Sequence, residues 1–66
     1  MIFPNYEYFL RIAEYENISK AAESLYISQP SLSKYLKKLE ESVGTELFER
    51  KQSSLRLTDG GRAFLE

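Results

Sequence analysis

The chain has 66 residues, with nine basic side chains, ten acidic side chains and no cysteine or histidine. A chain of this size forms one small domain that buries only about 60% of its unfolded surface. The missing thiols and imidazoles exclude disulfides and the common zinc sites, and they remove the usual general base. No apolar run exceeds three residues, so we expect no membrane span, no signal peptide and a cytoplasmic location.

Charge is distributed unevenly along the chain. Residues 1–26 hold two basic and four acidic side chains, whereas residues 27–66 hold seven basic and six acidic ones. Three lysines cluster at positions 34, 37 and 38. Affinity for nucleic-acid phosphates depends on the charges that face the duplex, so a net charge of −1 does not exclude DNA binding. We expect modest non-specific affinity and a need for dimerisation.

Apolar residues at helical spacing predict two helices in the first part of the chain. The first covers about residues 5–16, with Asn5 as its N-cap and Asn17 in the left-handed conformation at its end. Its core face is expected to contain Tyr6, Phe9, Leu10 and Ala13. Ser19 is the predicted cap of the second helix. The buried side of this helix is expected to hold Ala21, Ala22 and Leu25, and the two alanines favour close packing of helix backbones.

The third helix follows a short turn at Tyr26 and Ile27, and Ile27 is expected to fill the core between the second and third helices. Ser28 is the predicted N-cap, Pro30 fits the first turn, and Gly44 ends the helix in the left-handed conformation. The inward stripe is expected to be Leu32, Leu36, Leu39 and Val43. Two short helices joined by a tight turn, with lysines on the outer face of the second, are typical of a helix-turn-helix that enters a DNA major groove.

Alternating apolar and charged residues at 47–50 and 55–57 predict a two-stranded hairpin around residues 51–54. A two-stranded hairpin is not stable alone, so it is expected to pack on the helices as a wing. Thr58 is the predicted cap of a fourth helix, with Asp59 favourable and Gly60 and Gly61 unfavourable near its start. Because this helix stops after about two turns, we interpret the chain as part of a longer protein.

Several motifs occur together in this chain. Residues 28–33 read Ser-Gln-Pro-x-Leu-Ser, residues 39–40 read Leu-Glu, and residues 47–50 read Leu-Phe-x-Arg. In combination they are highly specific, and the whole chain resembles the N-terminal winged helix-turn-helix of LysR-type transcriptional regulators. The expected fold is therefore mainly α with a small β-hairpin: a three-helix core, a two-stranded wing and the start of a linker helix.

The resemblance also implies a domain organisation and partners. Residues 1–57 are expected to form the DNA-binding domain, and residues 58–66 to begin a linker helix that pairs two subunits. Members of the family commonly assemble as dimers of dimers on interrupted palindromes of double-stranded DNA. Their C-terminal effector-binding domain is absent from these 66 residues, so we expect no cofactor, metal or small-molecule ligand here.

The leading end of the third helix is expected to read base edges, because the Gln29 amide matches adenine N6 and N7 and Pro30 can press on a thymine methyl group. The predicted base contacts are Gln29, Pro30, Ser31, Ser33 and Lys34. The predicted phosphate contacts are Ser19, Lys20, Lys37, Lys38, Arg50, Lys51, Gln52 and Arg56. For Arg50, an ion pair with Glu40 or Glu46 that holds the wing is an equal alternative.

Two features depart from the family pattern. Many members have glycine or proline in the wing tip with an arginine that reaches the minor groove, whereas residues 51–54 here read Lys-Gln-Ser-Ser. Lys51 or Gln52 is the expected substitute. Lys34 stands where arginine is common, and lysine lacks the bidentate fork for guanine, which predicts a weaker or shifted base preference.

A second stripe on the first helix, formed by Tyr8, Ile12 and Tyr15, suggests a dimer contact. We hypothesise that it meets Phe64 or Leu65 of the fourth helix, from the same or the paired subunit. The alternative interpretation is that the stripe consists of tolerated surface residues.

The predicted function is sequence-specific DNA binding at the nucleoid, with the third helix in the major groove and the wing near the minor groove or the backbone. One rival is a winged helix that binds another protein, which the acidic balance favours. Its leading helix edge is polar, however, where a protein-binding surface more often exposes aromatic side chains. An enzyme is the second rival, but no histidine or cysteine is present and the carboxylates have no nucleophile partner.

Overall fold

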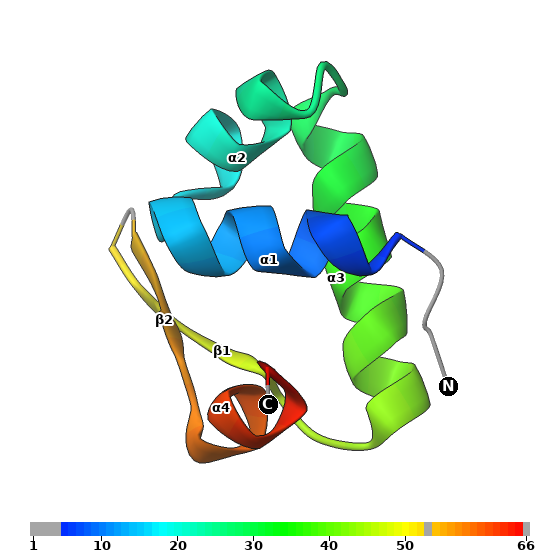
Figure 1. Cartoon of the computed structure of the whole chain (residues 1–66), viewed down its shortest axis with the longest axis vertical. Helices are drawn as coiled ribbons and strands as arrows, with labels where there is room; N and C mark the ends of the chain where they lie inside the picture. Colours follow the sequence, from blue (N-terminus) through cyan, green and yellow to red (C-terminus); the bar gives the residue numbers. More distant parts are fainter. Residues whose placement is uncertain (1–4, 53, 66) are drawn as a thin grey trace.

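A computed structural model describes residues 5–52 and 54–65 of the chain. The elements are α1 (Tyr6–Tyr15), α2 (Ile18–Ser24), α3 (Gln29–Val43), β1 (Phe48–Lys51), β2 (Ser54–Leu57) and α4 (Asp59–Leu65). Figure 1 shows α1 crossing in front of the longer α3, with α2 above α1 and the hairpin and α4 below α1. The mainly helical fold with a two-stranded wing is confirmed. No described helix is long and apolar enough to cross a membrane.

The boundaries of α3 follow from its terminal residues. The Ser28 hydroxyl oxygen accepts a hydrogen bond from the Ser31 amide at 3.2 Å, and Pro30 occupies the first turn. At the other end Gly44 has φ 89°, and its amide donates to the Glu40 carbonyl at 2.8 Å. Both caps are as predicted, because a hydroxyl satisfies an otherwise free amide and glycine adopts positive φ without strain.

The core lies where α1, α2 and α3 meet the hairpin. Its fully or almost fully buried members are Phe9, Ile12, Ala21, Ala22, Leu32, Leu36, Leu39, Leu47, Phe48 and Leu55. The predicted inward stripe of α3 is confirmed, with Val43 half-buried beside it. Burial of Ala21 and Ala22 agrees with close packing of α2, and Ile27 packs against the core as expected.

The buried face of α1 differs from the prediction. Ile12 has no exposed surface, whereas Leu10 is 39% exposed. An α-helix turns by about 100° per residue, so Ile12 lies only about 60° from Phe9 around the axis, while Leu10 lies on the other side of it. The expectation that Leu10 belongs to the core and Ile12 to an outer stripe is therefore wrong.

Two predicted helix ends are wrong, and a third is right in position only. Asn5 precedes α1 but has φ 58°, and its side chain makes no capping bond. The left-handed residue after α1 is Glu16 rather than Asn17. Asn17 instead caps α2, because its Oδ1 accepts from the Lys20 amide at 2.9 Å, and this places Ser19 inside the first turn.

The hairpin is antiparallel, and its register pairs Phe48 with Leu57 and Arg50 with Leu55. Two contacts fix its position on the helices. The Leu55 amide donates to the Glu16 carbonyl at 2.9 Å. The Glu40 carboxylate of α3 accepts from the amides of Leu47 at 2.7 Å and Phe48 at 3.2 Å.

The last helix, α4, begins as predicted. Thr58 Oγ1 accepts from the Gly61 amide at 3.0 Å and donates to the Glu46 carbonyl at 2.6 Å. The ring of Phe64 then packs on Phe9 with centroids 5.0 Å apart. Gly61 is buried against the carbonyl group of Leu47, where a Cβ atom would collide. Glycine is unfavourable for the helix itself, as expected, but the close approach at Gly61 requires it.

Candidate nucleic-acid interface

Side chains from three parts of the chain surround one surface hollow of about 240 Å³. Its lining residues are Asn17, Ile18, Ser19, Gln29, Arg50, Gln52, Ser54 and Leu55. They come from the start of α2, the start of α3 and the hairpin. The structure therefore brings together four residues that the sequence predicted separately as DNA contacts: Ser19, Gln29, Arg50 and Gln52.

The leading end of α3 is open to solvent. Gln29, Pro30 and Ser31 are exposed, as is Lys34, while Ser33 is half-buried. The Ser28 hydroxyl donates to Ser31 Oγ at 2.8 Å, which leaves the Ser31 proton free for a ligand. These polar groups are accessible as the base-reading prediction requires.

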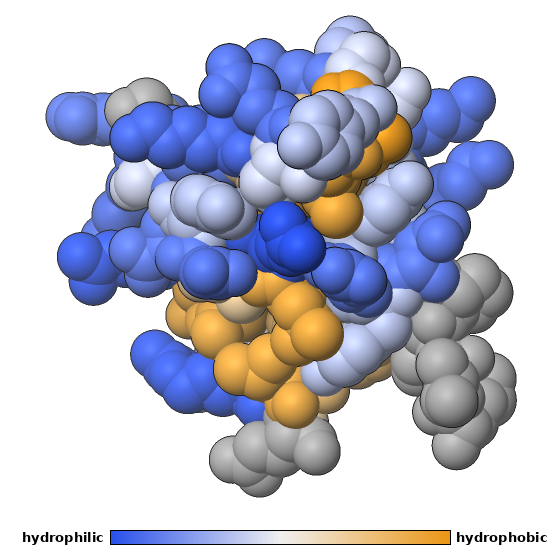
Figure 2. Space-filling model, turned by 45° about the horizontal axis from the view of Figure 1, so that its top comes forward, coloured by the Kyte–Doolittle hydropathy of each residue, from blue (hydrophilic) through white to orange (hydrophobic). Residues whose placement is uncertain are grey.

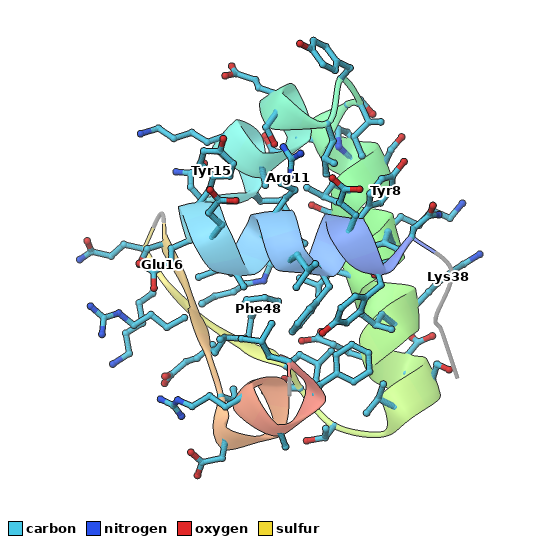
Figure 3. The ribbon with its side chains drawn as sticks, viewed as in Figure 1. Tyr8, Arg11, Tyr15, Glu16, Lys38 and Phe48 are labelled. Carbon is cyan, nitrogen blue, oxygen red and sulfur yellow. The ribbon has the colours of Figure 1, made fainter. Side chains whose placement is uncertain are left out.

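The lysines of α3 point in different directions. At about 100° per residue, Lys37 lies about 80° around the axis from Gln29, close to Ser33, while Lys38 lies on the opposite side from Gln29. Figure 3 shows Lys38 on the side of α3 remote from the hairpin. Both lysines are exposed. Lys37 therefore shares the face of Gln29, and Lys38 does not.

The hairpin separates the predicted phosphate contacts onto two sides. Arg50 and Gln52 line the hollow beside Gln29. Lys51 and Arg56 instead line a different hollow together with Glu16, Glu49 and Arg62, and Arg62 is paired with Asp59. The Arg50 hollow has no acidic residue in its lining, so it is the better match for an anionic backbone. Lys20 also lies away from the Gln29 hollow, beside Tyr15 and Glu23.

The alternative for Arg50, an ion pair that holds the wing, is wrong for the described residues. Glu40 uses its carboxylate on the backbone amides at the start of the hairpin. The ion pairs in residues 5–52 and 54–65 join Arg11 to Glu7 and Arg62 to Asp59, each at 3.0 Å. Arg50 is exposed and remains available to a ligand.

The hypothesis of a dimer stripe on α1 is also wrong in its main points. Ile12 is fully buried inside the chain. Tyr8 packs edge-on against Tyr35 of α3, with ring centroids 5.2 Å apart. Phe64 contacts Tyr6 and Phe9 rather than the Tyr8 side of α1. Of the four predicted dimer residues, Leu65 alone is classed as exposed, at 39%.

Large exposed apolar side chains are scattered in the described part of the chain. They are Leu10, Tyr15, Tyr26 and Leu65, from α1, the turn before α3 and the end of α4. Figure 2 shows hydrophilic side chains over much of one face, with apolar atoms between them. Figure 3 places Arg11 and Tyr15 on the side of α1 next to α2, while Phe48 lies between α1 and the hairpin.

Asn17 and Ser54 also line the hollow, although neither is among the predicted DNA contacts. The sequence does contain a signal for Asn17. Asparagine is as good an N-cap residue as serine, and Asn17, like Ser19, lies shortly before the helical residue Ala21. Ser54 has no such signal, because the pairing of the hairpin determines where it lies.

Comparison with known proteins identifies the family. The sequence profile of "Bacterial regulatory helix-turn-helix protein, lysR family" matches residues 3–62. This chain belongs to the LysR family. LysR-family relatives include the HTH-type transcriptional regulators CitR of Bacillus subtilis (strain 168) and BudR of Klebsiella aerogenes. CitR is 47% identical over 57 residues, and BudR is 48% identical over 59 residues.

These matches cover 86% and 89% of the chain, but only 20% of CitR and 41% of BudR. The chain therefore spans a minor part of the length of these LysR-family regulators. Among solved structures, the CbnR DNA-binding domain in its DNA complex has a TM-score of 0.90 and 38% identity, covering 98% of this chain and 75% of that one. The BenM DNA-binding domain bound to catB site 1 DNA has a TM-score of 0.87 and 36% identity, covering 97% and 71%.

Proposed function

We propose that this chain is the N-terminal DNA-binding domain of a LysR-type transcriptional regulator and that it binds double-stranded DNA in a sequence-dependent manner. The observation that carries the proposal is the meeting of Ser19, Gln29, Arg50 and Gln52 at one hollow beside the leading end of α3. The domains of CbnR and BenM, whose folds are closely similar, have been solved with DNA. The mechanism is binding without catalysis, at the nucleoid.

In this proposal α3 lies in the major groove. Gln29, Pro30 and Ser33 face base edges, and Ser31 and Lys34 contact bases or phosphates from the flanks of the helix. Lys37 neutralises a phosphate on the Gln29 side of α3. Lys38 takes a more distant phosphate across the groove.

The wing extends the contact beyond the major groove. Arg50 and Gln52 lie on the side of the hairpin that faces the hollow, and they contact the adjacent backbone or minor groove. Lys51, Arg56 and Lys20 are proposed as outer phosphate contacts that contribute less, because acidic residues lie beside them.

Two domains are needed for a complete site, because one domain of 66 residues with a net charge of −1 has little non-specific affinity. We propose that residues 58–66 begin the linker helix that pairs two subunits, with Leu65 in the contact. The DNA site is then an interrupted palindrome whose spacing reports the distance between two copies of α3.

The deciding experiment is selection from randomised DNA at two salt concentrations, with the wild-type chain, Gln29→Ala and Lys37→Ala. The wild type should enrich an interrupted palindrome or its half-site. Gln29→Ala should relax discrimination at one position by about 1–3 kcal/mol. Lys37→Ala should weaken binding to all sequences alike and reduce the logarithmic salt slope by about one.

Arg11→Gln is the matched control, because it removes one positive charge from a residue paired with Glu7 on α1. It should alter neither base choice nor the salt slope measurably. Absent or salt-insensitive DNA binding by the wild type would overturn the proposal and favour a module that binds another protein. Equal loss of specific and random affinity in Gln29→Ala would remove the base-reading role of that residue.

A further inference from the structure

The side chains of Ser19 and Gln29 are joined by a hydrogen bond. Ser19 lies in the first turn of α2, and Gln29 is the first residue of α3. The Ser19 hydroxyl donates to Gln29 Oε1 at 2.8 Å, and both side chains line the hollow beside Arg50. The two helices of the helix-turn-helix, α2 and α3, are thus linked at the first residue of α3, which is the recognition helix of the proposed function.

The chemistry of this bond limits what Ser19 can do. A serine hydroxyl has one proton, and here that proton is used on Gln29. It is therefore not available for donation to a phosphate, which is the role that the sequence analysis expected for Ser19. On the Gln29 amide, the bond occupies one lone pair of Oε1 and leaves the second lone pair and both Nε2 hydrogens free.

The free groups match an adenine edge. Adenine presents the N7 acceptor and the N6 donor in the major groove, which an amide NH₂ and an amide oxygen can meet together. A hydroxyl can donate to an amide oxygen or accept from an amide NH₂, so the bond to Ser19 restrains where the Gln29 amide lies rather than which of its two ends faces the base. Without this restraint the side chain samples several rotamers, and its discrimination between bases would fall.

We propose that Ser19 is a positioning residue for base recognition: its hydrogen bond restrains the Gln29 side chain to one rotamer at the start of α3, so that the amide meets one base position. The inference rests on the proposed function, because it requires Gln29 to contact a base. Asn17 stabilises this arrangement, because its side chain caps α2 and thereby holds the first turn in which Ser19 lies.

A double-mutant cycle tests the inference. The variants are Ser19→Ala, Gln29→Ala and the two combined, with Ser19→Thr as the conservative substitution that keeps the hydroxyl. Ser24→Ala is the matched control, because Ser24 also lies in α2 but donates to the Ala21 carbonyl of its own helix. For each variant we would measure affinity for the selected DNA, for its base substitutions and for random DNA, together with the melting temperature.

At the position where Gln29→Ala relaxes base choice, Ser19→Ala should lower the preference by roughly three- to tenfold, the effect of one hydrogen bond. Affinity for random DNA and the salt slope should stay unchanged. Ser19→Thr should retain the preference, and Ser19→Ala should have no further effect in the Gln29→Ala background.

The failures are distinguishable from one another. If Gln29→Ala relaxes base choice and Ser19→Ala leaves it intact, the positioning role is wrong and the proposed function stands. If Ser19→Ala weakens all DNA sequences and reduces the salt slope, Ser19 is a phosphate contact instead. If Gln29→Ala itself leaves base choice unchanged, base reading by Gln29 and the inference built on it are both overturned.

Discussion

The backbone of α4 at Gly61 packs directly against the carbonyl group of Leu47, at a distance that leaves no room for a side chain. The same carbonyl accepts a hydrogen bond from the Thr58 amide at 3.0 Å. A single peptide group before β1 therefore determines both where α4 starts and how closely it approaches the hairpin.

Gly61→Ala should destabilise the domain by about 2 kcal/mol or more, because the new Cβ must displace backbone rather than a flexible side chain. Gly60→Ala is the matched control. A Cβ there would lie 3.1 Å from the Thr45 methyl group, which can move, and alanine favours the helix. Urea unfolding of both variants compares them, and equal stability of Gly61→Ala and the wild type would contradict this account of the packing.

Glu40 joins the recognition helix to the wing, and its removal should loosen that connection. Glu40→Ala leaves the Leu47 and Phe48 amides without their carboxylate acceptor and should cost about 1–3 kcal/mol. The exposed neighbour Glu41 provides the control, with an expected change within about 0.5 kcal/mol for Glu41→Ala. Hydrogen exchange at the two amides should accelerate in the Glu40 variant only, and unchanged protection would show that other contacts hold the wing.

Tyr26 should be replaceable with a gain in stability. It adopts φ 59° in the turn before α3, and its side chain is 95% exposed. Asparagine tolerates the left-handed conformation better than tyrosine, so Tyr26→Asn should stabilise the domain by up to about 1 kcal/mol. Tyr15→Asn, at the last residue of α1, where φ is not positive, should instead lower the melting temperature. A lower melting temperature for Tyr26→Asn would mean that the Tyr26 ring of the wild type makes a contact whose stabilisation exceeds the cost of the backbone strain.

Tyr35 should make stability depend on alkaline pH. Its hydroxyl is buried without a hydrogen-bond partner in the described residues, and burial raises its pKa from 10.0 to about 12, opposed by the neighbouring Phe9 backbone. The folded state thus keeps the proton more tightly than the unfolded state. This contribution is complete below pH 10 and is lost as the pH rises towards 12.

Tyr35→Phe should therefore be as stable as the wild type or more so at neutral pH, by up to about 1 kcal/mol, since it removes an unpaired polar group. The stability difference between Tyr35→Phe and the wild type should widen between pH 10 and 12. A pH-independent difference for Tyr35→Phe would contradict the assignment.

The sequence predicted those helix ends at which a capping residue satisfies or relieves the backbone locally. Ser28, Gly44 and Thr58 each satisfy or relieve the backbone at one helix end, and all three lie where expected. The alternation in the hairpin likewise placed both strands to within one residue.

Features that depend on contacts between elements could not be predicted from the sequence. The sequence of α1 has aromatic and aliphatic residues on most of its faces. Helical spacing alone therefore did not decide whether Leu10 or Ile12 is buried. Neither Glu16 nor Tyr26 has a type that favours positive φ, and the structure imposes it on both. The Ser19–Gln29 bond joins residues ten positions apart across a turn, and only the packing of α2 on α3 reveals it.

The hydrogen bond from the Leu55 amide to the Glu16 carbonyl has a consequence for the choice of DNA sites. It anchors the wing to the corner between α1 and α2, and Glu40 anchors it to α3, so hydrogen bonds tie the wing to the helices on both sides. On the duplex of the proposed function, these bonds should keep the interval between the α3 contact and the wing contact constant. DNA whose local twist or groove width does not offer that interval should then bind less tightly, whatever its base sequence.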